Sequence, residues 1–111
     1  MPTLPVSLCD FGPPPACPDQ FNLAEYVLTS AGAAADKVAL TVVGGHESVL
    51  TTLSYGDLQD RVLHAAGGLA AMGLGRGDRV ILRIGHQIEF PIFYLATAAI
   101  GAVPVPTSPM L

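Results

Sequence analysis

Hydrophobic and polar positions follow a helical period most clearly between Ser54 and Gly73. Apolar side chains recur there in steps of three and four residues, which places them on one stripe of a helix: Leu58, Val62, Ala65, Ala66, Leu69 and Met72. Polar side chains take much of the other side: Asp57, Asp60, Arg61 and His64. Ser54 is a suitable N-cap and Gly73 a suitable C-terminal stop. The pattern predicts an amphipathic helix that the rest of the chain covers.

Shorter patterns predict the remaining elements. A short helix is expected over residues 21–31, with Asn22 as its cap and an apolar stripe that consists of Leu23, Val27 and Leu28. Two segments rich in β-branched residues, 38–43 and 49–53, predict a hairpin whose loop lies near residues 45–48. The pattern then predicts, in order, a strand over 79–84, a turn over 85–87, a helix over 88–100 and a strand over 103–106.

The expected helix over 88–100 is apolar around almost its whole circumference, which is typical of a helix buried in a large protein. Pro91 lies in its first turns, where the missing N–H costs little. Together with the strands on either side, this helix predicts a β-α-β unit with parallel strands and a right-handed crossover. The fold class is therefore expected to be α/β and incomplete, in the order helix, β-hairpin, helix, strand, helix, strand.

Composition changes this picture in one respect. Half of the 111 residues are hydrophobic and only 13% are charged, whereas ~25% is typical of a globular domain. Because a small self-contained domain needs more polar cover, we expect the chain either to self-associate through the 88–100 helix or to be a piece of something larger. The net charge of -4 gives no electrostatic footprint for nucleic acid, and the absence of an apolar run of ~18 residues argues against a membrane span.

Residues 1–20 are rich in proline and are expected to form a leader outside the domain, which then occupies residues 21–111. The leader is expected to lie on a neighbouring surface or to be disordered, with a proline-motif ligand as the alternative. It holds both cysteines, Cys9 and Cys17. We interpret them as reduced thiols of a cytoplasmic chain, with a disulfide or a metal site as alternatives. The N-terminus shows no basic region followed by an apolar core, so no secretion signal is expected.

Three glycines in the stretch GLGRGD, residues 73–78, invite comparison with a phosphate-binding loop. Such a loop lies between a strand and the start of a helix, so that its amides point at the ligand. This stretch instead follows a predicted helix and precedes a predicted strand. We therefore interpret it as a helix C-cap followed by a tight turn.

From residue 53 to residue 111 the chain resembles the start of the AMP-forming acyl-CoA synthetases, the adenylate-forming ligases that include luciferases. The resemblance rests on sequence motifs that come in the same order and at the same spacing as in the family. These are SYGDL opening a helix, GLGRGDRV leading into a strand, EFPIFYLATAAIGAV forming an apolar helix, and a strand that ends near proline. It covers residues 21–111 and leaves the leader outside. The opening FNLAE and the ending GAVPVPTSPML are more similar to aryl- or medium-chain carboxylate–CoA ligases than to amino-acid-activating enzymes.

This resemblance implies the N-terminal part of a ligase large domain. The parent enzyme would use ATP, Mg and CoA to adenylate a carboxylate and then form a thioester. The family's phosphate loop with its lysine, its ATP-ribose residues and its C-terminal lysine belong to later parts of the family pattern. No catalytic, cofactor-binding or metal-binding residue is therefore carried over to this chain. His86 and Gln87 stand where many relatives have Asn and Ser, which is expected to alter the helix cap and not the chemistry.

Adenylation of a carboxylate needs a metal and cationic groups aimed at the transferring phosphorus centre. Lys37 is expected in a linker, and the four arginines on separate helix, turn and strand faces. The remaining candidates are interpreted as loop, helix-surface, turn and capping residues: His46, His64, His86, Asp57 and Asp60. No pair among them is expected to act as an acid and a base.

We therefore expect an N-terminal fragment of a carboxylate–CoA ligase that is inactive alone and whose partner is the remainder of the ligase. Two alternatives stay open. One is a stand-alone interaction module that uses its apolar helix to bind a partner. The other is a complete small enzyme with a site that these patterns do not reveal.

Overall fold

The computed structural model describes residues 11–110. The elements are α1 (Leu23–Leu28), η1 (Thr29–Ala31), β1 (Val38–Val43), η2 (Gly45–Glu47), β2 (Val49–Ser54), α2 (Tyr55–Ala71), β3 (Arg79–Leu82), α3 (Glu89–Ala99) and β4 (Val103–Pro106). This order confirms the predicted α/β succession. Residues 11–20 of the expected leader are exposed and form no helix or strand, whereas residues 1–10 lie outside the described part.

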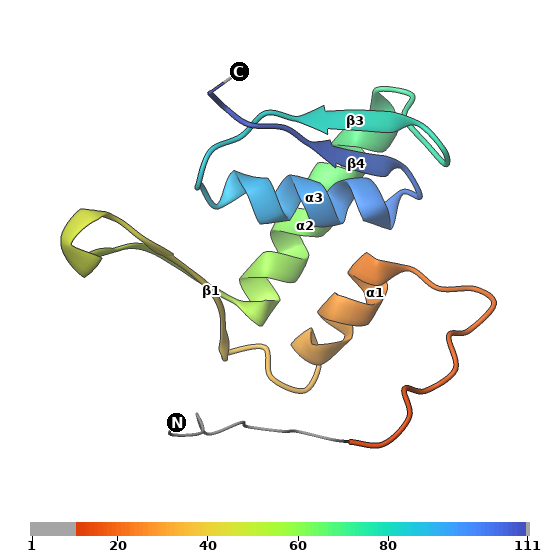
Figure 1. Cartoon of the computed structure of the whole chain (residues 1–111), viewed down its shortest axis with the longest axis horizontal. Coiled ribbons are helices and arrows are strands. Elements are labelled where there is room, and N and C mark those ends of the chain that lie inside the picture. The colour runs from red at the N-terminus through yellow and green to blue at the C-terminus, as the bar shows by residue number, and fades with distance from the viewer. Residues whose placement is uncertain (1–10, 111) are drawn as a thin grey trace, which may run out of the picture.

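The elements are arranged around α3, as Figure 1 shows. Strands β3 and β4 lie on one side of this helix, α1 lies on another, and α2 crosses behind it. The β1–β2 hairpin projects from the N-terminal end of α2. None of the helices in the described part of the chain is long and apolar enough to cross a membrane.

The start and the buried stripe of α2 agree with the sequence prediction. The Ser54 hydroxyl accepts a hydrogen bond from the Asp57 N–H at 3.1 Å, as expected of an N-cap. Four of the predicted stripe residues are buried: Leu58, Val62, Ala66 and Leu69. Met72 was placed wrongly, since it is 77% exposed. The helix ends at Ala71, so Met72 is a cap residue beyond the last packed turn.

The end of α2 is closed by backbone hydrogen bonds. The Gly73 N–H donates to the Ala70 carbonyl at 3.0 Å, and the Leu74 N–H donates to the Leu69 carbonyl at 3.3 Å. This pair of bonds is a Schellman motif, which needs a left-handed residue after the cap. Gly73 supplies that conformation with a φ of 90°. The predicted C-terminal stop is therefore confirmed.

The stretch after α2 is a tight turn, as predicted. The Asp78 carboxylate accepts a hydrogen bond from the Gly75 N–H at 2.8 Å. Gly77 has a φ of 84°, and its N–H donates to the Gly101 carbonyl at 3.0 Å. The amides of this stretch thus serve the turn and the end of α3.

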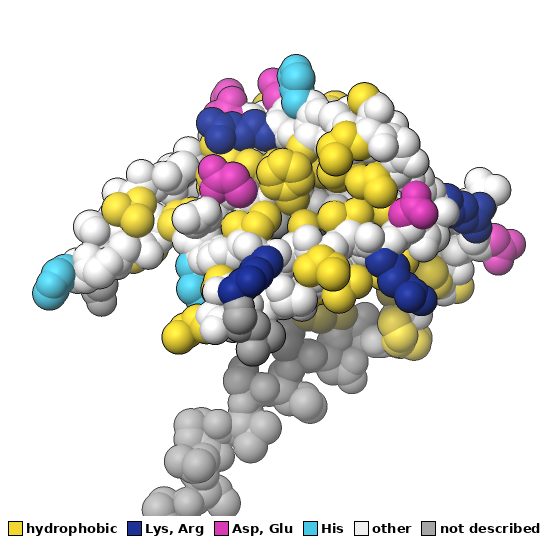
Figure 2. Space-filling model, turned by 90° about the horizontal axis from the view of Figure 1, so that it is seen from above, with side chains coloured by type: hydrophobic (Ala, Val, Ile, Leu, Met, Phe, Trp, Pro, Cys, Tyr) yellow, Lys and Arg dark blue, Asp and Glu magenta, His cyan; other side chains and the backbone are white. Residues whose placement is uncertain are grey.

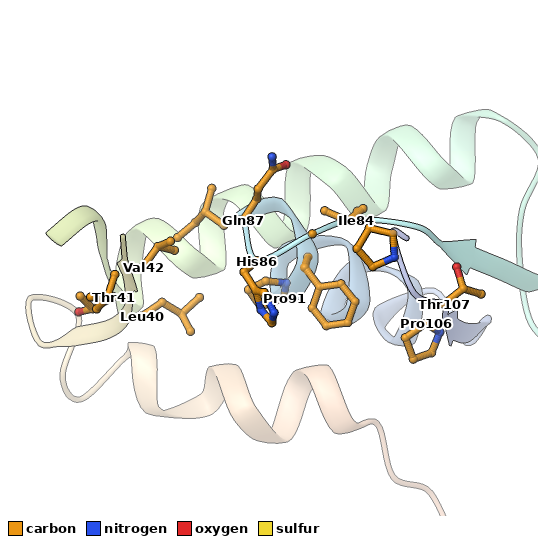
Figure 3. Close-up of a pocket in the computed structure, with 14 residues that line it drawn as sticks. Leu40, Thr41, Val42, Ile84, His86, Gln87, Pro91, Pro106 and Thr107 are labelled. Carbon is orange, nitrogen blue, oxygen red and sulfur yellow. The ribbon is translucent and has the colours of Figure 1, made fainter. Parts of the chain in front are cut away.

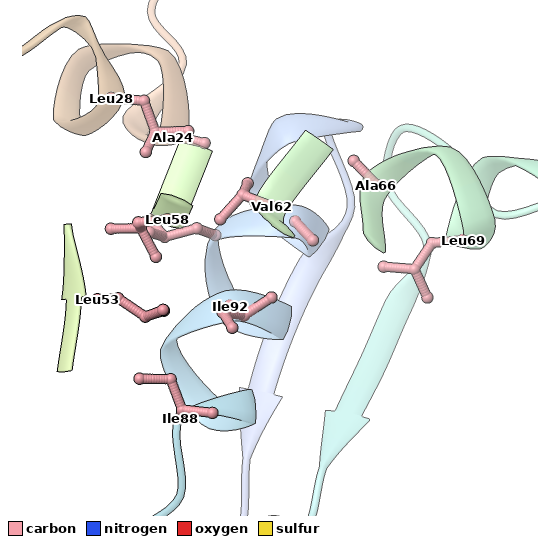
Figure 4. Packing of buried hydrophobic residues seen from close by; sticks show 11 residues of the cluster. Ala24, Leu28, Leu53, Leu58, Val62, Ala66, Leu69, Ile88 and Ile92 are labelled. Carbon is pink, nitrogen blue, oxygen red and sulfur yellow. The ribbon is translucent and has the colours of Figure 1, made fainter. Parts of the chain in front are cut away.

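The core lies between α2 and α3 (Figure 4). Val62 of α2 and Ala96 of α3 are 0% exposed, and Ile92 packs in the same cluster. The other buried members come from α1, β2, α2 and α3 with its cap Ile88: Ala24, Leu28, Leu53, Leu58, Ala66, Leu69, Ile88 and Leu95. Burial of each large side chain contributes about 1.5–3 kcal/mol, so this interface holds the elements together.

Helix α1 is shorter than predicted and turned differently. It ends at Leu28 and continues as η1, and its buried residues are Ala24 and Leu28. Leu23 was expected on the apolar stripe but is 43% exposed. Asn22 supplies a physical reason, because its side chain fixes α1 against α3. Its Oδ1 accepts from the Ala24 N–H at 3.0 Å, while its Nδ2 donates to the Ala98 carbonyl at 2.9 Å.

The two strand pairs have the predicted senses. Strands β1 and β2 are antiparallel, with irregularities in register near both ends, and β3 and β4 are parallel, with Arg79 opposite Val103. Strand β3 ends at Leu82, two residues earlier than expected. The last backbone hydrogen bond between β3 and β4 runs from the Thr107 N–H to the Leu82 carbonyl at 3.0 Å. After Leu82 the chain leaves the sheet and leads to α3. The last helix spans Glu89–Ala99, with Ile88 and Ile100 as its caps.

Candidate functional site

A groove of about 620 Å³ opens at the carboxyl ends of β3 and β4 (Figure 3). Its lining comes from β1, from the connection between β3 and α3 with the first turn of that helix, and from the end of β4 with the segment after it. Parallel pairing brings the ends of β3 and β4 to the same edge, which is where ligands bind in open α/β sheets. The fold therefore creates this groove from segments that are distant in sequence.

The groove is mainly apolar. Leu40 and Val42 lie on one side and Ile84 and Pro106 on the other, with Pro91 between them in the view of Figure 3. Polar groups come from four residues: Thr41, His86, Gln87 and Thr107. No Asp, Glu, Lys or Arg is among the described residues that line it. Such a lining suits an apolar group or a polypeptide segment, and it lacks the cations that a phosphate requires.

A second hollow lies between α2 and α3 and is lined by charged and apolar side chains. Its lining includes Asp57, Asp60 and Glu89 together with Arg61 and His64. Within residues 11–110, no group of three or more His, Cys, Asp or Glu side chains is placed to hold a metal ion. The acidic residues there are exposed, as expected for a solvated helix surface.

The structure brings only one of the sequence candidates into the groove, namely His86. His46 lies in the exposed hairpin loop, with a φ of 59°. The ring Nδ1 of exposed His64 is 2.7 Å from the Asp60 carbonyl oxygen on the same helix. Lys37 is exposed, and its carbonyl accepts from the Tyr55 N–H at 2.9 Å.

All four arginines are exposed. Arg83 lies near the groove, since its Nη2 donates to the Pro109 carbonyl at 3.4 Å. Arg61 lines the hollow between α2 and α3. Arg76 packs against Gly101. A Cβ atom added to Gly101 would lie 3.4 Å from the Cβ of Arg76.

Cys17 is exposed, and its thiol is 3.6 Å from the Pro18 carbonyl oxygen. Cys9 lies outside the described residues, so a disulfide between the two cysteines stays an untested alternative. Sequence reasoning did not single out Thr41, Ile84 or Thr107 as site residues. The only signal for Ile84 and Thr107 was their position, since Ile84 ends one expected parallel strand and Thr107 directly follows the other.

Comparison with known proteins identifies the family. Residues 28–111 match the AMP-binding enzyme family. The chain is 31% identical over 95 residues to 4-coumarate–CoA ligase 5 of Oryza sativa subsp. japonica, an alignment that covers 86% of this chain and 17% of that protein. It is 41% identical over 68 residues to the acetyl-coenzyme A synthetase of Thiobacillus denitrificans, covering 61% of this chain and 10% of that protein.

The solved structures agree. The acetoacetyl-CoA synthetase from Streptomyces lividans superposes with a TM-score of 0.76 and 31% identity, covering 80% of this chain and 14% of that one. The chain thus spans only a small part of the length of the proteins that it matches. It belongs to the AMP-binding enzyme family and has the fold of the N-terminal part of the large domain of adenylate-forming ligases.

Proposed function

We propose that this chain is the N-terminal part of an ATP-dependent carboxylate–CoA ligase and that it is inactive alone. The observation that carries the proposal is the family match over residues 28–111, combined with coverage of 17% of a full-length relative. In the parent enzyme the carboxylate would be adenylated and then transferred to the thiol of CoA. The role of this chain is to scaffold the domain that performs that chemistry, and its place of action is the cytoplasm.

The residues in the described part of the chain do not fit the ATP and Mg that the parent would use. The groove at the ends of β3 and β4 carries no cationic side chain, and no metal-binding cluster is present among residues 11–110. Phosphoryl chemistry needs cations aimed at the developing charge. We therefore assign no catalytic, cofactor-binding or metal-binding residue to this chain and derive no chemical step within it.

We also propose the class of carboxylate that the parent enzyme activates. The opening FNLAE and the ending GAVPVPTSPML favour an aryl or medium-chain carboxylate over an amino acid. The name of the rice relative fits an aryl carboxylate, since that protein is a 4-coumarate–CoA ligase. An aryl-CoA or medium-chain acyl-CoA synthetase is therefore the specific enzyme that we propose for the parent.

Carboxylate-dependent ATP–pyrophosphate exchange by the purified chain tests the proposal. We expect 4-coumarate, octanoate and acetate to give no exchange above a no-enzyme control, while an active ligase assayed beside it gives a clear signal. Exchange by this chain that depends on one of these carboxylates would overturn the proposal and favour a complete small enzyme.

The alternative is a stand-alone interaction module derived from such a ligase. The observation that favours it is the apolar surface on β3 and β4, where Ile81 is 70% and Val103 46% exposed. The reading frame after Leu111 separates the two functions. A frame that continues as a ligase supports the fragment, whereas a stop codon supports the module.

A further inference from the structure

The segment that leads into α1 is rich in proline and exposed. Every residue from 11 to 20 is exposed, and the side chain of Phe11 is 93% exposed. Figure 1 shows this segment as a red-to-orange loop that runs outside the helices and joins the body at α1. The match to the AMP-binding enzyme family begins only at residue 28. The segment therefore lies outside the part of the chain that the family accounts for.

Covalent geometry holds the middle of this segment in an extended conformation. The proline ring fixes φ at about −65° in Pro14, Pro15 and Pro18. A residue that precedes proline is also held extended, and this applies to Pro14 and Cys17. Residues 14–18 contain no helix, strand, turn or bend. They therefore favour a polyproline II helix, which needs no support from the rest of the fold.

Side chains three positions apart form ridges along a polyproline II helix, because it has about three residues per turn. Two neighbouring ridges of this segment are apolar and consist of four residues: Pro14, Pro15, Cys17 and Pro18. The third ridge consists of Ala16, with Asp19 one turn further along. Because burial of an unpaired carboxylate is costly, the third ridge faces water and the two apolar ridges form a contact face.

The backbone of the segment mainly accepts hydrogen bonds. Proline has no N–H, so Ala16 and Cys17 carry the only backbone donors among residues 14–18. The Cys17 thiol lies 3.6 Å from the Pro18 carbonyl oxygen. A groove that binds this segment must therefore donate hydrogen bonds to carbonyls and offer flat apolar surfaces to proline rings. Tyr and Trp side chains supply both.

Charge contributes little to the contact face. The Asp19 carboxylate is the only charged side chain in residues 11–20. On the face of the body that Figure 2 shows, basic and acidic side chains are interspersed among hydrophobic ones. The segment thus offers a partner a distinct shape, and a groove flanked by carboxylates would be repelled by Asp19.

We propose that residues 14–18 dock into an aromatic-lined groove on a separate protein, of the type that binds Pro-x-x-Pro segments. Pro15 and Pro18 have this spacing. The proline rings restrict the segment before it binds, which lowers the entropy cost of docking. The proposal goes beyond the ligase function and does not depend on it, because it rests on the leader alone.

The probe is an SH3 domain in which asparagine replaces the acidic residues beside the groove, so that Asp19 is not repelled. It is titrated by NMR into the 111-residue chain. We expect the amide signals of Ala16 and Cys17 to shift, while the signal of buried Val62 stays in place. The same domain with a groove Trp replaced by Ala should not bind.

Substitutions in the chain should follow the ridges. Pro15→Ala or Pro18→Ala removes a contact and should weaken binding roughly five- to tenfold, and the double variant should not bind. Pro13→Ala is the matched control, since it loses a proline ring outside the contact face and should bind as the unaltered chain does. All three positions are exposed, so thermal melts should be unchanged.

Failure of the chain to bind the probe would overturn the proposal. So would binding that survives the Pro15→Ala, Pro18→Ala double variant, because the same spacing recurs at Pro2 and Pro5 and at Pro106 and Pro109. An equal loss in Pro13→Ala would show that the ridges do not set the contact. These results are independent of the exchange assay, so an active chain would overturn the proposed function alone.

Discussion

Glycine has opposite roles inside α2 and just beyond its C-terminal end. Gly67 lies within α2, where a built Cβ would meet no other atom within 4 Å. Gly73 lies just beyond the helix with a φ of 90°. Sequence position was enough to predict the second role, because a glycine after the last apolar residue is a stop signal. The contacts around Gly67 give no reason for a glycine at that position.

Replacing Gly67 with alanine is expected to raise the free energy of unfolding by about 0.4–1 kcal/mol, because the unfolded chain loses conformational freedom. Gly73→Ala is the matched control and should lower it by about 1–2 kcal/mol, since alanine is strained in the left-handed region. Urea denaturation of both variants measures the difference. A loss of stability in Gly67→Ala would show that the exposed side of α2 is more crowded than the structure indicates.

The stripe of α2 gives a second test at this scale. Leu69 is 8% exposed, so Leu69→Asp buries an unpaired carboxylate and should cost ~3–5 kcal/mol or prevent folding. Asp60 is exposed, and Asp60→Ala should stay within ~0.5 kcal/mol. Thermal melts of the two variants compare these positions. Equal shifts in melting temperature would mean that the buried face is assigned wrongly.

The elements themselves follow from local patterns, but their orientation does not. The seven predicted helices and strands all exist, because periodicity and turn residues act over a few neighbours. The rotation of α1 depends on Asn22, whose side chain reaches a carbonyl 76 residues away. The groove is likewise assembled from β1, the start of α3 and the segment after β4. No local pattern encodes such contacts, so the sequence predicted the cap at Asn22 and missed both the tie to α3 and the groove.

The two functions of Asn22 can be separated by substitution. Asn22→Ser keeps an oxygen that caps α1 but is too short to reach the Ala98 carbonyl, so it should lose about 0.5–1.5 kcal/mol. Asn22→Ala loses the cap as well and should cost about 1 kcal/mol more. Denaturation midpoints should therefore rank the unaltered chain above the serine variant and the serine variant above the alanine variant. A serine variant as stable as the unaltered chain would show that the bond to α3 adds nothing.

For the whole molecule, composition predicted an excess of apolar surface but not its location. We expected that surface on the 88–100 helix, yet every residue from Phe90 to Ala99 is buried or half-buried. Large exposed apolar side chains lie elsewhere, for example Leu50 on the hairpin, Ile81 on the sheet and Met72 at the end of α2. Helix α3 takes most of its cover from β3, β4, α1 and α2.

Self-association through α3 stays a prediction for the isolated chain, and Phe93 is the residue that tests it because its side chain is half-buried. Analytical ultracentrifugation across a dilution series measures it. Phe93→Glu should shift the chain toward monomer, whereas Phe93→Leu should not. A monomer at every concentration, unchanged by Phe93→Glu, would mean that the cover within one chain is sufficient.

The parallel pairing of β3 with β4 also delays the formation of this sheet while the chain is being synthesised. The β1–β2 hairpin joins neighbouring segments and can close within about 1–10 μs of leaving the ribosome. Strand β3 must wait until its partner Val103 has been added. At about 5–20 residues per second, that interval lasts roughly 1–5 s. During it, the most apolar helix of the chain is made before the sheet that covers it exists. The nascent chain should therefore bind a chaperone most strongly while residues 88–103 emerge.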